Sequence, residues 1–100
     1  MALRKIGPVE DFPINKGTCI DVDGKRIAVF NTTGQYYAID DACPHAGASF
    51  SEGTVVGSKV TCPLHGASVD VRIGSCTPPS PSDVETYEIS CDSTHLFIDL

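Results

Sequence analysis

The sequence predicts an all-β fold, either a sandwich or a small barrel. Apolar and polar residues alternate in short runs along most of the chain, and turn-forming residues recur every several positions. No stretch of about ten residues combines a clear helical period with a capping residue, and the nearest candidate is a single turn over 9–12. The expected elements are therefore short strands joined by tight turns.

The first strand pair is predicted around Asp23-Gly24, a two-residue hairpin signal within the run GTCIDVDGKRIAVFN. A glycine-containing turn over 32–34 then leads into a strand over 35–39. Shorter strands are expected further along the chain, at 55–56, 59–61, 69–71, 84–89 and 96–99. No internal repeat, low-complexity segment or linker interrupts this order, so residues 1–100 are expected to form one domain.

Composition and charge narrow the class of function. The chain has 100 residues, of which 41% are hydrophobic and 20% charged, an ordinary globular composition. A domain of this size buries only a modest core, so a metal or a disulfide that cross-links its loops would add useful stability. The net charge of −6 argues against nucleic acid, whose phosphates attract basic faces. It suits a positively charged protein partner, although an acidic surface more often only keeps a protein in solution.

Targeting signals and cysteine usage bear on the compartment. No apolar run follows the basic residues near the N-terminus, and none approaches the roughly 18 residues that span a bilayer. We therefore expect a soluble, cytoplasmic protein. The chain has five cysteines, an odd number, and in a reducing compartment cysteines more often bind metal, react or pack than form disulfides.

Two loops each pair a cysteine with a histidine, which indicates a metal site. Cys43 and His45 lie in DDACPHAGASF, and Cys62 and His65 lie in TCPLHGASVD. Two thiolates and two imidazoles suit zinc or iron–sulfur chemistry. A zinc finger keeps its cysteines in one pair and its histidines in another, whereas each loop here supplies one of each. A tetrahedral zinc site stays open, but a [2Fe–2S] cluster with two cysteines on one iron and two histidines on the other fits better.

The spacing of these residues resembles the Rieske motif C-x-H … C-x-x-H, and the whole chain is similar to the small Rieske-type ferredoxins of bacterial aromatic-ring dioxygenases. The resemblance includes the preceding hairpins, the SEGTVVG connection and the VDVRIG segment after the second loop. It implies an antiparallel β-sandwich base with a small inserted cluster-binding subdomain at about 41–81. It also implies one [2Fe–2S] cluster per chain, bound by Cys43, His45, Cys62 and His65, with both histidines on the docking face.

The residues around the motif bear on the reduction potential. Rieske proteins of respiratory and photosynthetic complexes carry an extra cysteine in each loop, joined as a disulfide, where this chain has Ala48 and Leu64. After the second loop those proteins place a serine and a tyrosine that donate hydrogen bonds to cluster sulfur, where this chain has Ala67 and Val69. Fewer donors stabilise the reduced cluster less, so the resemblance implies a potential near the lower end of the roughly −150 to +300 mV Rieske range. Ser68 is another candidate donor, but strand alternation points its side chain away.

The function implied by this resemblance is electron transfer without catalysis by the chain itself. A monomeric ferredoxin would pass single electrons from an NAD(P)H-dependent flavoprotein reductase to a terminal oxygenase. Three alternatives stay open. The small subunit of an assimilatory nitrite reductase has a similar fold, and a structural zinc-binding module would use the same four residues. A redox sensor is the third, although the sequence supplies no output domain for it.

Several other residues carry weaker expectations. Three cysteines lack ligand spacing: Cys19, Cys76 and Cys91. They are expected to be buried or half-buried thiols. Three acidic residues flank the first cluster loop: Asp40, Asp41 and Glu52. They form either a partner-docking rim or a solvated surface. A third loop over 75–83 is stiffened by three prolines, Pro78, Pro79 and Pro81. This loop is either a surface crossover or a rigid lid over the site.

Overall fold

The computed structural model describes residues 3–32, 34–42, 48–63, 66–77 and 82–99. Within these ranges the fold is all-β, as predicted, with ten strands and two short 3-10 helices. In chain order the elements are β1 (Leu3–Pro8), η1 (Val9–Asp11), β2 (Gly17–Val22), β3 (Lys25–Thr32), β4 (Gln35–Asp40), η2 (Phe50–Glu52), β5 (Thr54–Val56), β6 (Lys59–Thr61), β7 (Ser68–Asp70), β8 (Ser75–Cys76), β9 (Thr86–Cys91) and β10 (His95–Asp99). No helix in the described ranges is long and apolar enough to cross a membrane.

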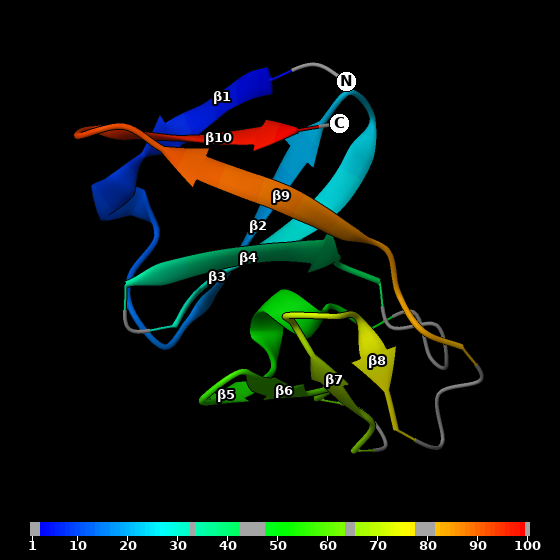
Figure 1. The fold of residues 1–100 in the computed structure, drawn as a ribbon. Coiled ribbons are helices and arrows are strands. Elements are labelled where there is room, and N and C mark those ends of the chain that lie inside the picture. The colour runs from blue at the N-terminus through cyan, green and yellow to red at the C-terminus, as the bar shows by residue number, and fades with distance from the viewer. Residues whose placement is uncertain (1–2, 33, 43–47, 64–65, 78–81, 100) are drawn as a thin grey trace.

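The strands form two antiparallel sheets. A six-stranded sheet has the order β1-β10-β9-β4-β3-β2, and a four-stranded sheet has the order β5-β6-β7-β8. The chain leaves the larger sheet at the end of β4, builds the smaller sheet, and returns to the larger one at β9 (Figure 1). Both predicted cluster loops and the third loop belong to this intervening segment.

The β2–β3 hairpin forms where Asp23-Gly24 predicted it. Asp23 has φ of 51° and Gly24 has φ of 84°, and a two-residue type I′ turn requires positive φ at both positions. Val22 pairs with Lys25 directly across the turn, and the ladder continues from there to Gly17 opposite Phe30. The hairpin register thus follows from two residues of local turn chemistry.

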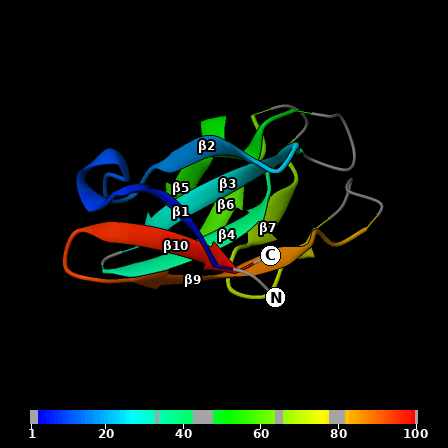
Figure 2. The ribbon, with the colours of Figure 1, turned by 90° about the horizontal axis from the view of Figure 1, so that it is seen from above.

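Two hydrophobic cores lie on opposite sides of β3. Its four central residues are all fully buried, with Ile27 and Val29 in one core and Ala28 and Phe30 in the other. Successive side chains of a strand point to opposite faces, so a strand with a core on each side has a continuous apolar run. The core that contains Ile27 and Val29 is formed mainly by side chains of the larger sheet. The core that contains Ala28 and Phe30 joins that sheet to the smaller sheet beneath it (Figures 1 and 2).

The structure adds two strands that were not predicted. The β1 strand contains Gly7 and Pro8, which read as strand breakers, and its pairing with β10 shifts between Lys5 and Gly7 in a bulge-like irregularity. The β8 strand has only two residues, too few for a periodic signal. The predicted turn over 9–12 is confirmed as η1.

Candidate metal centre

One of the four predicted ligands lies among the residues that the structure describes. Cys62 lies within them, whereas Cys43, His45 and His65 lie outside. Cys62 follows directly after β6 and is buried, with 2% of its surface exposed. Its position is therefore set by the hairpin that β6 and β7 form.

The second cluster loop is the loop of the β6–β7 hairpin. Thr61 pairs with Ser68, and the Cys62 N–H donates a hydrogen bond of 2.6 Å to the carbonyl oxygen of Ala67. Gly66 has φ of +74°, a left-handed conformation that glycine adopts without steric cost, so the turn alone accounts for the glycine. The hydrogen bond and the strand pairing fix both described ends of this loop.

The first cluster loop is closed in a similar way between β4 and η2. The Phe50 N–H donates a hydrogen bond of 2.8 Å to the Asp41 carbonyl oxygen, and Ala42 forms an antiparallel bridge with Ser49. The Asp41 N–H donates in turn to the carbonyl oxygen of Arg26 at 3.1 Å, which attaches the loop to the larger sheet. We call residues 41–42 and 49–51 the neck of the first loop.

The two cluster loops meet in one core. Phe50 from the first loop shares a buried cluster with Cys62 and Ala67, the two ends of the second, and Ala48 packs against the same cluster. This packing, together with the donor chemistry of two cysteines and two histidines in the sequence, fits a site built between two loops.

The third loop is attached to the second at its described start. The Thr77 N–H donates to the Ser68 carbonyl oxygen at 2.8 Å, and the Thr77 hydroxyl oxygen accepts from the Ser68 N–H at 2.9 Å. The Asp83 carboxylate accepts from the Cys76 N–H at 3.0 Å across the loop. Pro78, Pro79 and Pro81, which raised the choice between lid and crossover, lie outside the described residues.

The prediction that Asp41 lies at the surface, in a docking rim or a solvated face, is wrong. Asp41 is buried, so it cannot form a docking rim, whereas Glu52 is exposed and Asp40 is half-buried. Burial of the Asp41 carboxyl opposes its ionisation, but hydrogen bonds from Ser51, Ser49 and Cys19 outweigh this and hold its pKa below the usual value. The burial of Asp41 could not be predicted from the sequence, because an acid next to a loop is normally solvated.

Two of the three cysteines without ligand spacing also differ from expectation. Cys76 is half-buried, as predicted, but Cys19 and Cys91 are exposed. The Cys19 Sγ lies 3.4 Å from Nη2 of Arg26, which donates to it, and 3.6 Å from Oδ2 of Asp41. Cys91 ends β9. Alternation in a strand decides which side chain faces the core, and the sequence alone left the register open.

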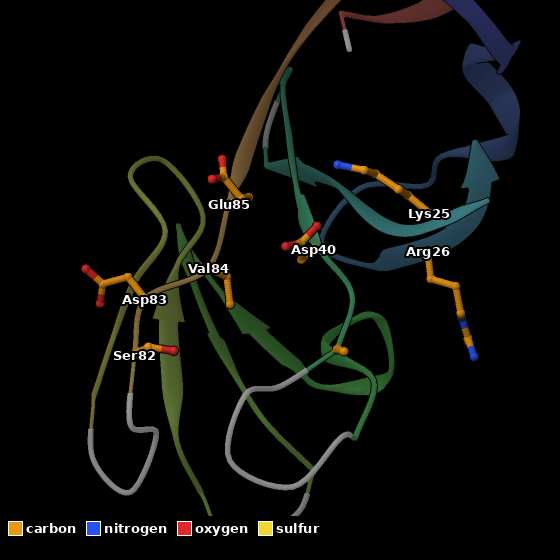
Figure 3. Close-up of a pocket in the computed structure, with 8 residues that line it drawn as sticks. Lys25, Arg26, Asp40, Ser82, Asp83, Val84 and Glu85 are labelled. Carbon is orange, nitrogen blue, oxygen red and sulfur yellow. The ribbon is translucent and has the colours of Figure 1, made fainter. Parts of the chain in front are cut away.

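A charged cleft of about 520 Å³ borders the first and third loops. Figure 3 shows its lining, in which Lys25 and Arg26 come from the start of β3, and Asp83 and Glu85 come from the segment before β9. Lys25 also lies 5.6 Å from the centre of the Tyr87 ring. Charges of both signs therefore line a surface next to the candidate centre.

The hydroxyl of Tyr87 donates a hydrogen bond of 2.7 Å to Oδ1 of Asp40, which lines this cleft. Burial, and next this bond to a carboxylate, raise the pKa of Tyr87, so the phenol stays protonated as the donor. Asp40 is thereby held at the end of β4, on the approach to the neck of the first loop.

The fold is that of a small all-β protein in which two Cys/His loops share one core, and comparison with known proteins specifies its family. The Rieske [2Fe-2S] domain family matches residues 3–88. The chain is 33% identical over 92 residues to the ferredoxin component of the naphthalene 1,2-dioxygenase/salicylate 5-hydroxylase systems of Ralstonia sp. The matched residues cover 90% of this chain and 88% of that protein. The chain belongs to the Rieske [2Fe-2S] domain family.

Two further similarities place the chain among the ferredoxins of that family. It is 39% identical over 95 residues to the 3-phenylpropionate/cinnamic acid dioxygenase ferredoxin subunit of Escherichia coli (strain K12), covering 93% of this chain and 89% of that one. The ferredoxin of carbazole 1,9a-dioxygenase from Nocardioides aromaticivorans IC177 has the same fold, with a TM-score of 0.90 and 29% identity over 98% of this chain and 97% of that one. The cofactor is therefore a [2Fe–2S] cluster, and the zinc alternative is set aside.

Proposed function

We propose that this chain carries single electrons to the terminal oxygenase of an aromatic-ring dioxygenase system, and that an NAD(P)H-dependent flavoprotein reductase supplies them. The observation that carries the proposal is the similarity to two dioxygenase ferredoxins over at least 90% of the chain. The chain itself is an electron-transfer component, not an enzyme. We further propose that it acts as a monomer in the cytoplasm, where NAD(P)H is available and cysteines stay reduced.

In this proposal the ligands are divided between the two loops. Cys43 and Cys62 hold one iron, and His45 and His65 hold the other, so each loop contributes one ligand to each iron. The burial of Cys62 in one core with Ala67 and Phe50 supports a site between the two loops, since it places one thiol at the point where the loops meet. When bound, the cluster supplies one-electron redox chemistry. The cluster-binding subdomain in this proposal covers about residues 41–81.

The experiment that tests the electron-transfer role uses the purified holoprotein under anaerobic conditions. A flavoprotein reductase with NADH should bleach the visible absorption of the cluster, and mixing with an oxidised terminal oxygenase should restore it. The control is a reaction without the reductase, which should stay oxidised. Reduction without any reoxidation by a panel of ring-hydroxylating oxygenases would contradict the proposed acceptor and favour the nitrite reductase alternative.

The reduction potential is expected to lie below zero against the standard hydrogen electrode. Ala67 and Val69 are fully buried and have no side-chain donor, and the Ser68 hydroxyl lies 3.4 Å from that of Thr61 on the other face. The reduced cluster therefore gains few hydrogen bonds from this strand, which disfavours reduction. Protein-film voltammetry measures the midpoint directly, and a positive value would show that donors elsewhere compensate.

A further inference from the structure

Asp41 stands out as the one buried charged side chain among the described residues, with 1% of its surface exposed. It lies two positions before Cys43, in the neck of the first loop. A buried carboxylate is costly unless hydrogen bonds and opposite charge compensate it. The partners of Asp41 therefore indicate what the side chain does.

The Asp41 backbone and side chain hold both arms of the neck together. Oδ1 accepts a hydrogen bond of 3.0 Å from the Ser51 N–H, while the Asp41 carbonyl oxygen accepts one of 2.8 Å from the Phe50 N–H. On the opposite side the Asp41 N–H donates to the Arg26 carbonyl oxygen at 3.1 Å. One residue thus joins β3, the outgoing arm of the loop and the returning arm.

The second carboxylate oxygen lies beside two groups of the larger sheet. Oδ2 is 3.6 Å from Nη2 of Arg26 and accepts a hydrogen bond of 3.6 Å from the thiol of Cys19. The Arg26 side chain is 63% exposed, so water screens the positive charge, whereas the Asp41 side chain is 2% exposed. Water therefore weakens the attraction between the two side chains, and Arg26 neutralises the buried negative charge only in part.

We infer that Asp41 is a positioning residue for the first ligand loop, and that its buried negative charge lowers the reduction potential of the centre. The carboxylate fixes the two arms from which Cys43 and His45 extend. A negative charge in a poorly screened interior opposes the arrival of an electron nearby. The inference rests on the proposed ligand set, but not on the identity of the redox partners.

The competing interpretation gives Asp41 a purely structural role, in which it only accepts the hydrogen bonds from Ser51, Ser49 and Cys19. Two substitutions separate the roles. Asp41→Asn keeps an oxygen that can accept from Ser51 but removes the charge, whereas Asp41→Ala removes both. The matched control is Asp40→Asn, which removes the same charge from the adjacent residue. Its carboxylate is half-buried and accepts from the Tyr87 hydroxyl, a bond that an asparagine oxygen can also accept.

The experiment measures iron and acid-labile sulfide per chain, the midpoint potential by voltammetry, and the rate of cluster bleaching with a chelator. We expect Asp41→Asn to keep its cluster and to shift the midpoint upward by more than Asp40→Asn does. We expect Asp41→Ala to lose the cluster several-fold faster than Asp41→Asn. If Asp41→Ala does not fold, the comparison between the two asparagine variants still decides the effect of the charge.

Equal midpoint shifts in the two asparagine variants would overturn the inference, because they would report only a change in total charge. Equal bleaching rates in Asp41→Ala and Asp41→Asn would overturn the positioning role. Neither measurement uses a reductase or an oxygenase, so a wrong redox partner leaves the result intact. A wild-type chain that holds no iron and sulfide would instead show that the proposed ligand set fails.

Discussion

Replacing Cys62 with alanine is expected to remove the cluster. One iron of a Rieske centre is held by two cysteines, so the loss of one leaves that iron with a single protein ligand. Cys62 is buried at the end of β6, in one core with Phe50, Ala67 and Val69, whose side chains carry no metal-ligating atom. Residues that only support metal ligands already change metal affinity about 10–100-fold, so iron content should fall below about a tenth of wild type.

The matched control for this variant is Cys76→Ala. Cys76 packs against the same buried cluster of side chains as Cys62, but it is not among the proposed ligands. Both substitutions remove one sulfur from the same region, so a general packing defect would affect them alike. We expect Cys76→Ala to keep its iron, its acid-labile sulfide and its visible spectrum. Full iron content in Cys62→Ala would refute the proposed ligand set.

Local chemistry explains most of what the sequence predicted. The β2–β3 hairpin depends on two neighbouring residues that accept positive φ, and the predicted metal site depends on residue types at fixed spacing. The structure buries Cys62 at the end of β6, and its role as a ligand stays a prediction. Each signal is read from residues close in sequence, two in the hairpin turn and one Cys/His pair in each loop, so it can be recognised without knowledge of the tertiary fold.

Features set by tertiary contacts were not predictable in the same way. Asp41 reads as one of two surface acids before a loop, yet its burial depends on β2, β3 and η2 packing around it. Cys19 was expected inside and is exposed, because the register of β2 turns it outward. The β1 strand is recognisable only through β10, since Gly7 and Pro8 obscure its pattern. In each case a partner distant in sequence decides the outcome.

Replacing Phe50 with alanine is expected to give the largest loss of stability. Phe50 is 0% exposed in the core between the two sheets, and truncation of a buried phenylalanine costs about 3–5 kcal/mol. A small domain has a free energy of unfolding of only about 5–15 kcal/mol, so the variant should be marginal. The cavity would also open beside Cys62 and Ala67, the two ends of the second cluster loop.

Phe12→Ala is the control that separates stability from site integrity. Phe12 is 2% exposed and belongs to the other core, with Leu96 and Ile98, so its truncation should cost a similar amount of stability. Guanidinium unfolding should be followed by far-ultraviolet circular dichroism for the sheets and by visible absorption for the cluster. We expect both signals to be lost together in Phe12→Ala, and the visible signal to be lost first in Phe50→Ala.

This order of loss follows from where each phenylalanine lies. The Phe50 N–H bonds to the Asp41 carbonyl oxygen in the neck of the first loop, while the Phe50 ring packs with both ends of the second. Removing the ring loosens the region where the loops meet before the larger sheet unfolds, because β1, β9 and β10 have contacts of their own. Coincident transitions in Phe50→Ala would instead mean that the two sheets unfold as one cooperative unit, with the cluster loops no weaker than the base.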